Sequence, residues 1–245
     1  VVGHLMSGDQ AVVFQEKHGW AQTYYDGQVA WVAAHYLYPA ENNTAVHVIS
    51  SGGDHNTETQ PAKPTGTLNG YTIVLDPGHG GKDPGAIGLR GTLEKSHTMN
   101  TVYSVAEGLR NAGATVILTR SNDTYVSLED RVSLSHDYAT DAFISLHYNA
   151  FPLEAVNGFS TYYYTNGNDR SLAATIQSGL EQNMALNSRG LMQEGYHVLR
   201  ENSDLAVLVE LGFITNPYDL SVIQTAEHQR NVADGIVEGV MTYFN

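Results

Sequence analysis

Hydrophobic and polar positions divide the chain into three parts that differ in periodicity. In the first part, alternating apolar residues predict three short strands, at residues 10–14, 20–25 and 28–32. Asp26-Gly27, between the last two strands, is a hairpin turn signal. Residues 39–69 are polar, aperiodic and rich in proline and glycine, which predicts a flexible linker. From residue 70 onward, apolar runs of strand length alternate with segments of helical periodicity.

This third part predicts an α/β domain. Its pattern predicts strands at residues 71–75, 115–120, 142–146, 159–164 and 205–209. It predicts helices at residues 95–111, 127–138, 169–186 and 226–243. Because strands that alternate with helices tend to pair in parallel, we expect a mixed, mostly parallel sheet flanked by helices on both faces, preceded by a small all-β module.

Composition narrows the classes of protein to which the chain can belong. With 245 residues, of which 42% are hydrophobic, it is long enough for a large domain and a small one. A formal net charge of −14 argues against binding to nucleic acids and to anionic membrane surfaces. No apolar run is long enough to span a bilayer. No signal peptide is visible before the starting Val1-Val2, so we expect a processed or trimmed chain.

Candidate chemistry gathers at the ends of three predicted strands. His79 follows the first strand in a glycine-rich loop, His147 ends the third strand, and Glu210 ends the last. Because the carboxyl ends of parallel strands meet at one edge of a sheet, we expect these side chains to lie close together. Glu94 opens the first helix and is a fourth candidate. The chain has no cysteine, and two histidines with one carboxylate are a common catalytic zinc set that leaves the other carboxylate as a general base.

Glu210 interrupts a run, residues 205–213, that is otherwise apolar. Burying an ionised carboxylate there costs free energy unless a partner is present. One interpretation is a functional carboxylate, and the other is a structural ion pair with Arg189 or Arg200. Periodicity alone leaves the two interpretations about equally supported.

Other polar residues carry weaker signals. His97 lies three residues after Glu94 and could share a metal on one helix face, but a solvated or supporting role is favoured. His197 precedes a strand-like segment and could line a groove, although a role without chemistry is favoured. The run Tyr162-Tyr163-Tyr164 is expected to alternate between strand surface and core, with one ring able to floor a glycan groove. Five further histidines have no partner pattern: His4, His18, His35, His136 and His228.

Several motifs resemble those of one enzyme family. Residues 73–86 read Ile-Val-Leu-Asp-Pro-Gly-His-Gly-Gly-Lys-Asp-Pro-Gly-Ala, and further matching stretches are 93–95, 118–120, 143–150 and 207–216. In this order they closely resemble zinc-dependent N-acetylmuramoyl-L-alanine amidases of the amidase-3 type, over residues 70–245. Ser96-His97-Thr98 departs from the family's usual acidic and Asn-containing turn, and Leu146 stands where Ile is common, but no functional group is lost.

The resemblance implies a site and a reaction. It implies one zinc per chain, held by His79, Glu94 and His147, with Glu210 as the catalytic carboxylate. The implied reaction is hydrolysis of the amide between the lactyl group of N-acetylmuramic acid and L-alanine of the peptidoglycan stem peptide. Such an enzyme is expected to be a secreted, wall-associated hydrolase of the autolysin kind from a Gram-positive bacterium. It is expected to be a monomer. Two alternatives remain: a zinc peptidase that cuts within the stem peptide, and a non-catalytic wall-binding regulator.

Substrate contacts are expected from residues near the implied site. Arg189-Gly190 resembles the family's Arg-Gly pair and could orient a stem-peptide carboxylate, and Arg200 and Asn149 are further candidates. Residues 151–204 are expected to hold one strand, one helix and short loops, so no spare helix would occlude the metal.

The first 38 residues resemble a bacterial SH3-like module. The resemblance is partial, because a strand or two that usually precede the stretch matching residues 2–5 are missing. The alternative is an ordinary β-meander with two core tryptophans. The expected domains are therefore a partial wall-binding module at 1–38, a flexible linker at 39–69 and a zinc amidase domain at 70–245.

Overall fold

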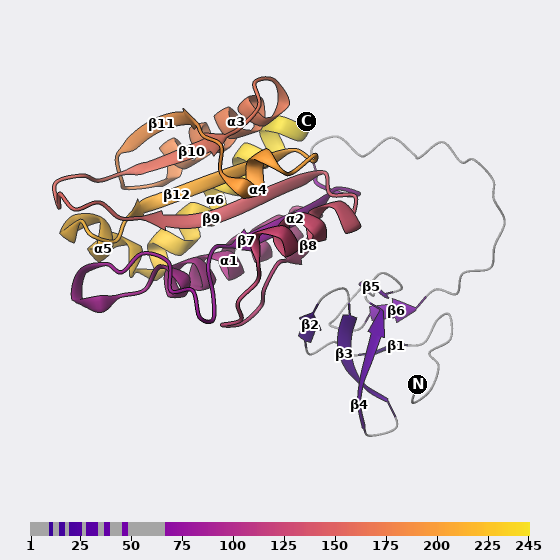
Figure 1. The fold of residues 1–245 in the computed structure, drawn as a ribbon. Coiled ribbons are helices and arrows are strands. Elements are labelled where there is room, and N and C mark those ends of the chain that lie inside the picture. The colour runs from indigo at the N-terminus through magenta and orange to yellow at the C-terminus, as the bar shows by residue number, and fades with distance from the viewer. Residues whose placement is uncertain are drawn as a thin grey trace. The chain divides into compact units, whose positions relative to one another are not determined.

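The structure is a computed structural model in which the chain divides into two compact units, residues 1–61 and 62–245 (Figure 1). It describes residues 67–245 and, before them, six short strands: β1 (Gln10–Ala11), β2 (Gln15–Lys17), β3 (Trp20–Tyr25), β4 (Gln28–Ala33), β5 (Leu37–Pro39) and β6 (Val46–Val48). Among the side chains of that earlier part, it describes those of Ala21, Trp31 and Val32. Each unit is treated by itself.

The described strands of the first unit form two antiparallel sheets, ordered β2-β3-β4 and β1-β6-β5. The predicted hairpin is confirmed, because β3 and β4 pair with Tyr25 opposite Gln28. Trp31 is 42% exposed, which argues against a meander with two core tryptophans. The stretch expected to be linker contains β6, a Val-His-Val triplet too short to stand out as alternation. The residues that carry the SH3-like resemblance at 2–5, 8–9, 18–19, 26–27 and 36 lie outside the described residues.

The second unit is built on a six-stranded sheet of order β11-β10-β12-β9-β7-β8. The strands are β7 (Thr72–Pro77), β8 (Thr115–Leu118), β9 (Ala142–Asn149), β10 (Phe159–Tyr163), β11 (Ser188–Gln193) and β12 (Ala206–Phe213). Every neighbouring pair in this sheet is parallel except β10 with β12. The expected mixed, mostly parallel sheet is confirmed.

Helices cover both faces of this sheet, as predicted (Figure 1). They are α1 (Glu94–Asn111), α2 (Leu128–Asp137), α3 (Asn168–Asn183), α4 (His197–Arg200), α5 (Pro217–Ile223) and α6 (Ala226–Phe244), with a short 3-10 turn at Leu89–Gly91. The larger core receives Val105 from α1, Ile176 from α3 and Ile236 from α6. The smaller core, on the opposite face, receives Val132 from α2 and Leu199 from α4.

Some predicted boundaries are wrong, for physical reasons. The segment predicted to be strand-like after His197 is helix α4, because Val198 is its only β-branched residue and Leu199 readily forms helix. The strand β11 was not predicted, because it is an edge strand without apolar alternation. Leu68 is fully buried and its N–H donates to the carbonyl of Ala112, so the second unit begins before residue 70.

Candidate metal and catalytic site

His79 lies in the loop after β7, with its ring held from one side. Its Nδ1 is 2.8 Å from Asp83 Oδ2, and the other oxygen of Asp83 accepts a hydrogen bond from the N–H of Gly85 at 3.0 Å. Because a carboxylate only accepts, Nδ1 must donate, and the lone pair of the neutral ring is then placed on Nε2. Nε2 lies 3.1 Å from Glu94 Oε2. The loop therefore aims the nitrogen of His79 that could bind a metal at Glu94.

Glu94 is the first residue of α1 and is 4% exposed. Its Oε2 accepts from the N–H of Ala86 at 2.8 Å, and its Oε1 accepts from the N–H of Tyr148 at 3.1 Å. Oε1 also lies 2.8 Å from His147 Nδ1. Two backbone amides and two histidine rings thus fix both oxygens, and the helix N-terminus favours the negative charge.

The two histidine rings meet edge to face, with centroids 4.8 Å apart. One donor atom each from His79, Glu94 and His147 lies within 4.8 Å of the other two, so this group could hold a metal ion. The backbone at residue 78 passes so close to the ring of His147 that only glycine fits there, because a Cβ would collide with the ring. The two ring side chains keep 23% and 18% of their surface exposed, so the site opens to solvent.

Glu210 lies beside this group on β12. In the parallel pairing of β12 with β9 its register partner is His147, so both side chains project from the same face of the sheet. Both residues lie within their strands, which extend further than predicted. The Oε2 of Glu210 is buried and has no hydrogen-bond partner among the described residues.

The alternative ion pair of Glu210 with Arg189 or Arg200 is not formed in the described part of the chain. The guanidinium of Arg189 lies over the ring of Phe213, 5.3 Å from its centroid. Arg200 bonds Glu201 at 2.8 Å and the carbonyl of Gly195 at 2.7 Å.

The four side chains perturb one another's protonation. Burial raises the pKa of Glu210 to about 7, an effect that His147 opposes and the charge of Glu94 reinforces. Burial would also raise the pKa of Glu94, but the hydrogen bonds from His147 and His79 outweigh it and hold that pKa well below its usual range. Burial would lower the pKa of His79, yet Glu94 and Asp83 raise it to about 9. The pKa of His147 is raised in the same way, mainly by Glu94.

This donor set suits a cation such as zinc. Two imidazoles and one carboxylate are ligands of the type found in three-ligand catalytic zinc sites. Without an ion, the positions facing Glu94 are filled by the protons of the two histidines, which a cation would displace. His97 is not part of the group.

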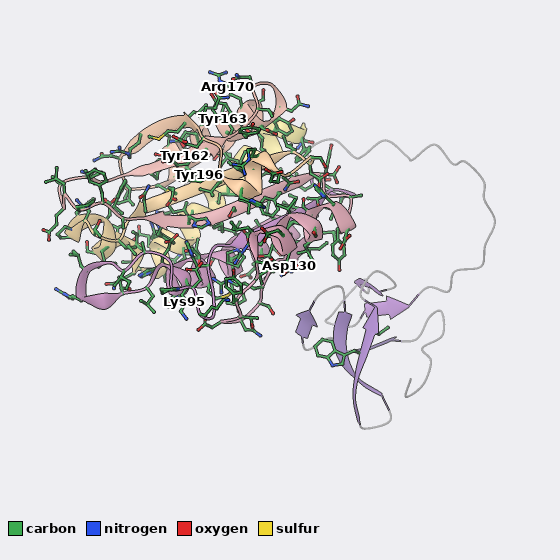
Figure 2. All side chains as sticks on the ribbon, in the orientation of Figure 1. Lys95, Asp130, Tyr162, Tyr163, Arg170 and Tyr196 are labelled. Atoms are coloured by element: carbon green, nitrogen blue, oxygen red, sulfur yellow. The ribbon has the colours of Figure 1, made fainter. Side chains whose placement is uncertain are left out.

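The sequence named three residues as candidates for substrate contact. Arg189 and Arg200 are exposed, and the Oδ1 of Asn149 accepts from the N–H of Ala150 at 2.8 Å, at the end of β9. Tyr162 and Tyr196 pack edge to face at 5.3 Å and lie side by side in Figure 2. Burial raises the pKa of both tyrosines, and the charge of Glu210 adds to the rise.

Of the two roles expected for His97, the solvated one is wrong, and His228 has a partner that the sequence did not show. His97 is 8% exposed rather than solvated, with Nε2 2.7 Å from Thr92 Oγ1 and its ring against Tyr148. His228 is 2% exposed and its Nε2 is 3.1 Å from the hydroxyl of Tyr148. Tyr148 is distant in sequence from both histidines, so no local pattern marks it as their partner.

His136, from the set without a partner pattern, and His197 also have described partners. His136 accepts from the N–H of Ser203 at 3.2 Å, and His197 lies 3.9 Å from Glu129. The other three, His4, His18 and His35, lie outside the described residues.

Four supporting residues were not predicted to have a role: Asp76, Asp83, Arg120 and Arg131. Asp76 carried a usable signal, because it interrupts an apolar strand as Glu210 does. It is 1% exposed. The argument from buried charge that singled out Glu210 would have found it too.

Comparisons with known proteins agree on one family. The family model described as N-acetylmuramoyl-L-alanine amidase matches residues 73–242. The chain is 42% identical over 180 residues to a "Probable cell wall amidase LytH" of Staphylococcus aureus, covering 73% of this chain and 60% of that relative's length.

Two solved structures are also similar. The catalytic domain of CwlV, an N-acetylmuramoyl-L-alanine amidase from Bacillus (Paenibacillus) polymyxa var. colistinus, is 32% identical with a TM-score of 0.68, covering 71% of this chain and 97% of that one. AmiC2 of Nostoc punctiforme, also an N-acetylmuramoyl-L-alanine amidase, is 35% identical with a TM-score of 0.68, covering 71% and 96%.

Proposed function

The chain belongs to the N-acetylmuramoyl-L-alanine amidase family, and on this premise we propose that it hydrolyses the amide between the lactyl group of N-acetylmuramic acid and L-alanine in peptidoglycan. Family membership supports the reaction class, a hydrolase acting on cell-wall amides. The observation that carries the proposal is the convergence of His79, Glu94 and His147 beside Glu210.

In this proposal His79, Glu94 and His147 hold one zinc ion per chain. When bound, the ion supplies Lewis-acid polarisation of the scissile carbonyl and lowers the pKa of a water molecule. The chain's own contribution is to hold the donors in place. Asp83 keeps Nδ1 of His79 protonated, and two backbone amides keep both oxygens of Glu94 directed at the histidines.

Glu210 is the proposed general base. It would take a proton from the attacking water at its buried Oε2 and transfer it to the leaving amine of L-alanine. A carboxyl whose pKa stands at about 7 in the metal-free site can both accept and return a proton near neutral pH. The charge of a bound cation would lower that pKa, so Glu210 would be ionised at neutral pH.

Substrate binding is proposed for the residues around this edge of the sheet. The exposed guanidinium groups of Arg189 and Arg200 would bind carboxylates of the stem peptide, and Asn149 would hydrogen-bond its backbone. Net charge and family together support peptidoglycan rather than a nucleic acid as the partner.

The wider setting is also a proposal, because the chain spans 60% of the length of the curated relatives it matches. We infer a secreted, wall-associated enzyme of a Gram-positive bacterium that acts as a monomer. Residues 1–38 would be a partial SH3-like module for wall binding, joined by a linker to the zinc amidase domain. Within the described residues, no helix is both long and apolar enough to cross a membrane.

The test is digestion of purified peptidoglycan followed by mass spectrometry, with zinc analysis of the same preparation. Stem peptides released intact with a free N-terminal alanine, by a protein holding one zinc per chain, would support the amidase. Cleavage between residues of the stem would instead indicate a zinc peptidase. Binding to peptidoglycan with no cleavage by a zinc-loaded protein would indicate a non-catalytic regulator.

A further inference from the structure

Two buried arginines contact the backbone segment that leads to His79. Arg120 lies two residues after the end of the edge strand β8, and Arg131 lies on α2. The two side chains are buried, with Arg120 4% and Arg131 3% exposed. Their guanidinium groups donate to three consecutive carbonyls, those of Pro77, Gly78 and His79. We call the two side chains the arginine clamp.

Each guanidinium of the clamp bridges two carbonyls. Arg120 donates from Nε to Pro77 at 2.9 Å and from Nη2 to Gly78 at 2.8 Å. Arg131 donates from Nη1 to Pro77 at 3.1 Å and from Nη2 to His79 at 2.8 Å. A planar guanidinium presents its donors in a fixed fork, so these paired bonds define the orientation of the peptide planes.

The clamp is itself anchored to the sheet and to α1. Asp76 accepts from Arg131, from the hydroxyl of Thr119 at 2.6 Å and from that of Ser145 at 2.7 Å. Burial would raise the pKa of Asp76, but Arg131 and the two hydroxyls hold it below its usual value, so the carboxylate stays ionised. Arg120 is also held by α1, because its Nη2 donates to the hydroxyl of Thr98 at 3.0 Å.

The clamped segment requires such support. His79 has φ of 62°, a left-handed conformation that residues other than glycine seldom adopt and that surrounding contacts must maintain. The backbone of Gly78 lies so close to the ring of His147 that a Cβ would not fit. The same short segment therefore carries one proposed metal ligand and supports the ring of a second.

We propose that Arg120 and Arg131 are positioning residues that set the affinity and geometry of the metal site through the backbone of residues 77–79. This inference rests on the proposed metal-binding function. Neither guanidinium is among the donor groups, so the effect is transmitted by the carbonyls they hold. Substitutions that keep the charge but lose the fork test the role directly.

The experiment uses the full chain with Arg120→Lys or Arg131→Lys, purified metal-free and titrated with zinc against a competing chelator. We expect zinc affinity to fall by about 10- to 100-fold, the range found for groups that orient metal ligands. With cobalt in place of zinc, we expect the visible d–d absorption to change in energy or intensity, because His79 would be displaced. Arg170→Lys, an exposed arginine on α3 labelled in Figure 2, should leave both readouts unchanged.

A second control separates positioning from general stability. Val240→Ala opens a cavity on α6, in the larger core, and should lower the melting temperature without changing zinc affinity or the cobalt spectrum. If either arginine variant fails to fold, Thr98→Val removes the hydroxyl that donates to the carbonyl of Gly78 and accepts from Arg120, both at 3.0 Å. It leaves the carbonyl bonds of both arginines in place, so zinc binding should weaken by up to about 10-fold, the lower end of the range for an arginine.

The outcomes are distinguishable from failure of the proposed function. If the unsubstituted protein binds no zinc, or His79→Ala binds it as well, the metal site itself is misassigned. If the unsubstituted protein binds zinc and the folded clamp variants bind it equally, with the same cobalt spectrum, the clamp has only a structural role and the inference is wrong.

Discussion

Glu210→Gln should abolish most activity and yet make the metal-free protein more stable at alkaline pH. The substitution keeps the size and shape of the side chain but removes its charge and its ability to take a proton. Loss of a general base costs on the order of 10²–10⁴ in rate, which corresponds to about 3–5 kcal/mol of transition-state stabilisation. Zinc content should be unchanged, because the three proposed ligands, His79, Glu94 and His147, are all retained.

The stability effect follows from burial of the same carboxyl. In the folded metal-free protein its pKa is raised from 4.5 to about 7, so the folded state binds this proton more tightly than the unfolded state does. The protein therefore loses stability as pH rises from 4.5 through 7, by about 3 kcal/mol in total, since one pKa unit corresponds to about 1.4 kcal/mol. A glutamine side chain at this position does not ionise, so the variant should avoid this loss.

The assay combines turnover of purified peptidoglycan by the zinc-loaded proteins with denaturant unfolding of the metal-free proteins at pH 4.5 and pH 8. We expect the variant to gain stability over the unsubstituted protein at pH 8 but not at pH 4.5. Glu107→Gln, an exposed glutamate on α1, is the matched control and should change neither quantity. A variant that loses zinc, or that keeps turnover within tenfold, would refute the role assigned to Glu210.

Four further predictions concern the metal, pH, access and salt. Changing His79 or His147 to Ala should remove both zinc and activity; full zinc occupancy in either variant, measured by metal analysis, would contradict the ligand assignment. The melting temperature of the metal-free protein should fall between pH 6.5 and 9. The pKa of His79 is raised in the folded state, so its proton stabilises the fold below that range and is lost across it. A melting temperature that does not change with pH would argue against the His79–Glu94 contact. Residues 62–245 alone should cleave purified peptidoglycan without an activating partner, since His79 and His147 remain partly exposed; a folded, zinc-loaded but inactive unit would contradict this. On intact walls the rate should rise with moderate salt, because screening weakens repulsion between the acidic chain and anionic wall polymers.

The open-site prediction depends on the elements between His147 and Glu210. The sequence predicted one strand and one helix there, whereas the structure has β10, α3, β11 and the four-residue α4. The extra elements are a sheet edge and a single helical turn. None of the helices in that interval is a long additional segment available to cover the site.

The sequence by itself predicted most of the elements and singled out the side chains of the candidate site. Apolar runs and helical periodicity report which face of a segment is buried, and this information lies within each segment. The strand before His79 and the helix after Glu94 were therefore predicted within a residue or two of their observed bounds. Glu210 stood out because an ionisable group in an apolar run is costly wherever that run is placed.

Only the tertiary structure decided which groups meet. Glu94 contacts His147 across 53 positions, and Arg131 contacts the carbonyl of His79 across 52. The register that sets Glu210 beside His147 depends on how β12 pairs with β9. A linear pattern encodes burial, which is a property of one segment, whereas a hydrogen bond or a metal site requires two or more segments to be placed to within a fraction of an ångström. For this reason the arginine clamp and the contacts of Tyr148 with His97 and His228 were not visible until the chain was folded.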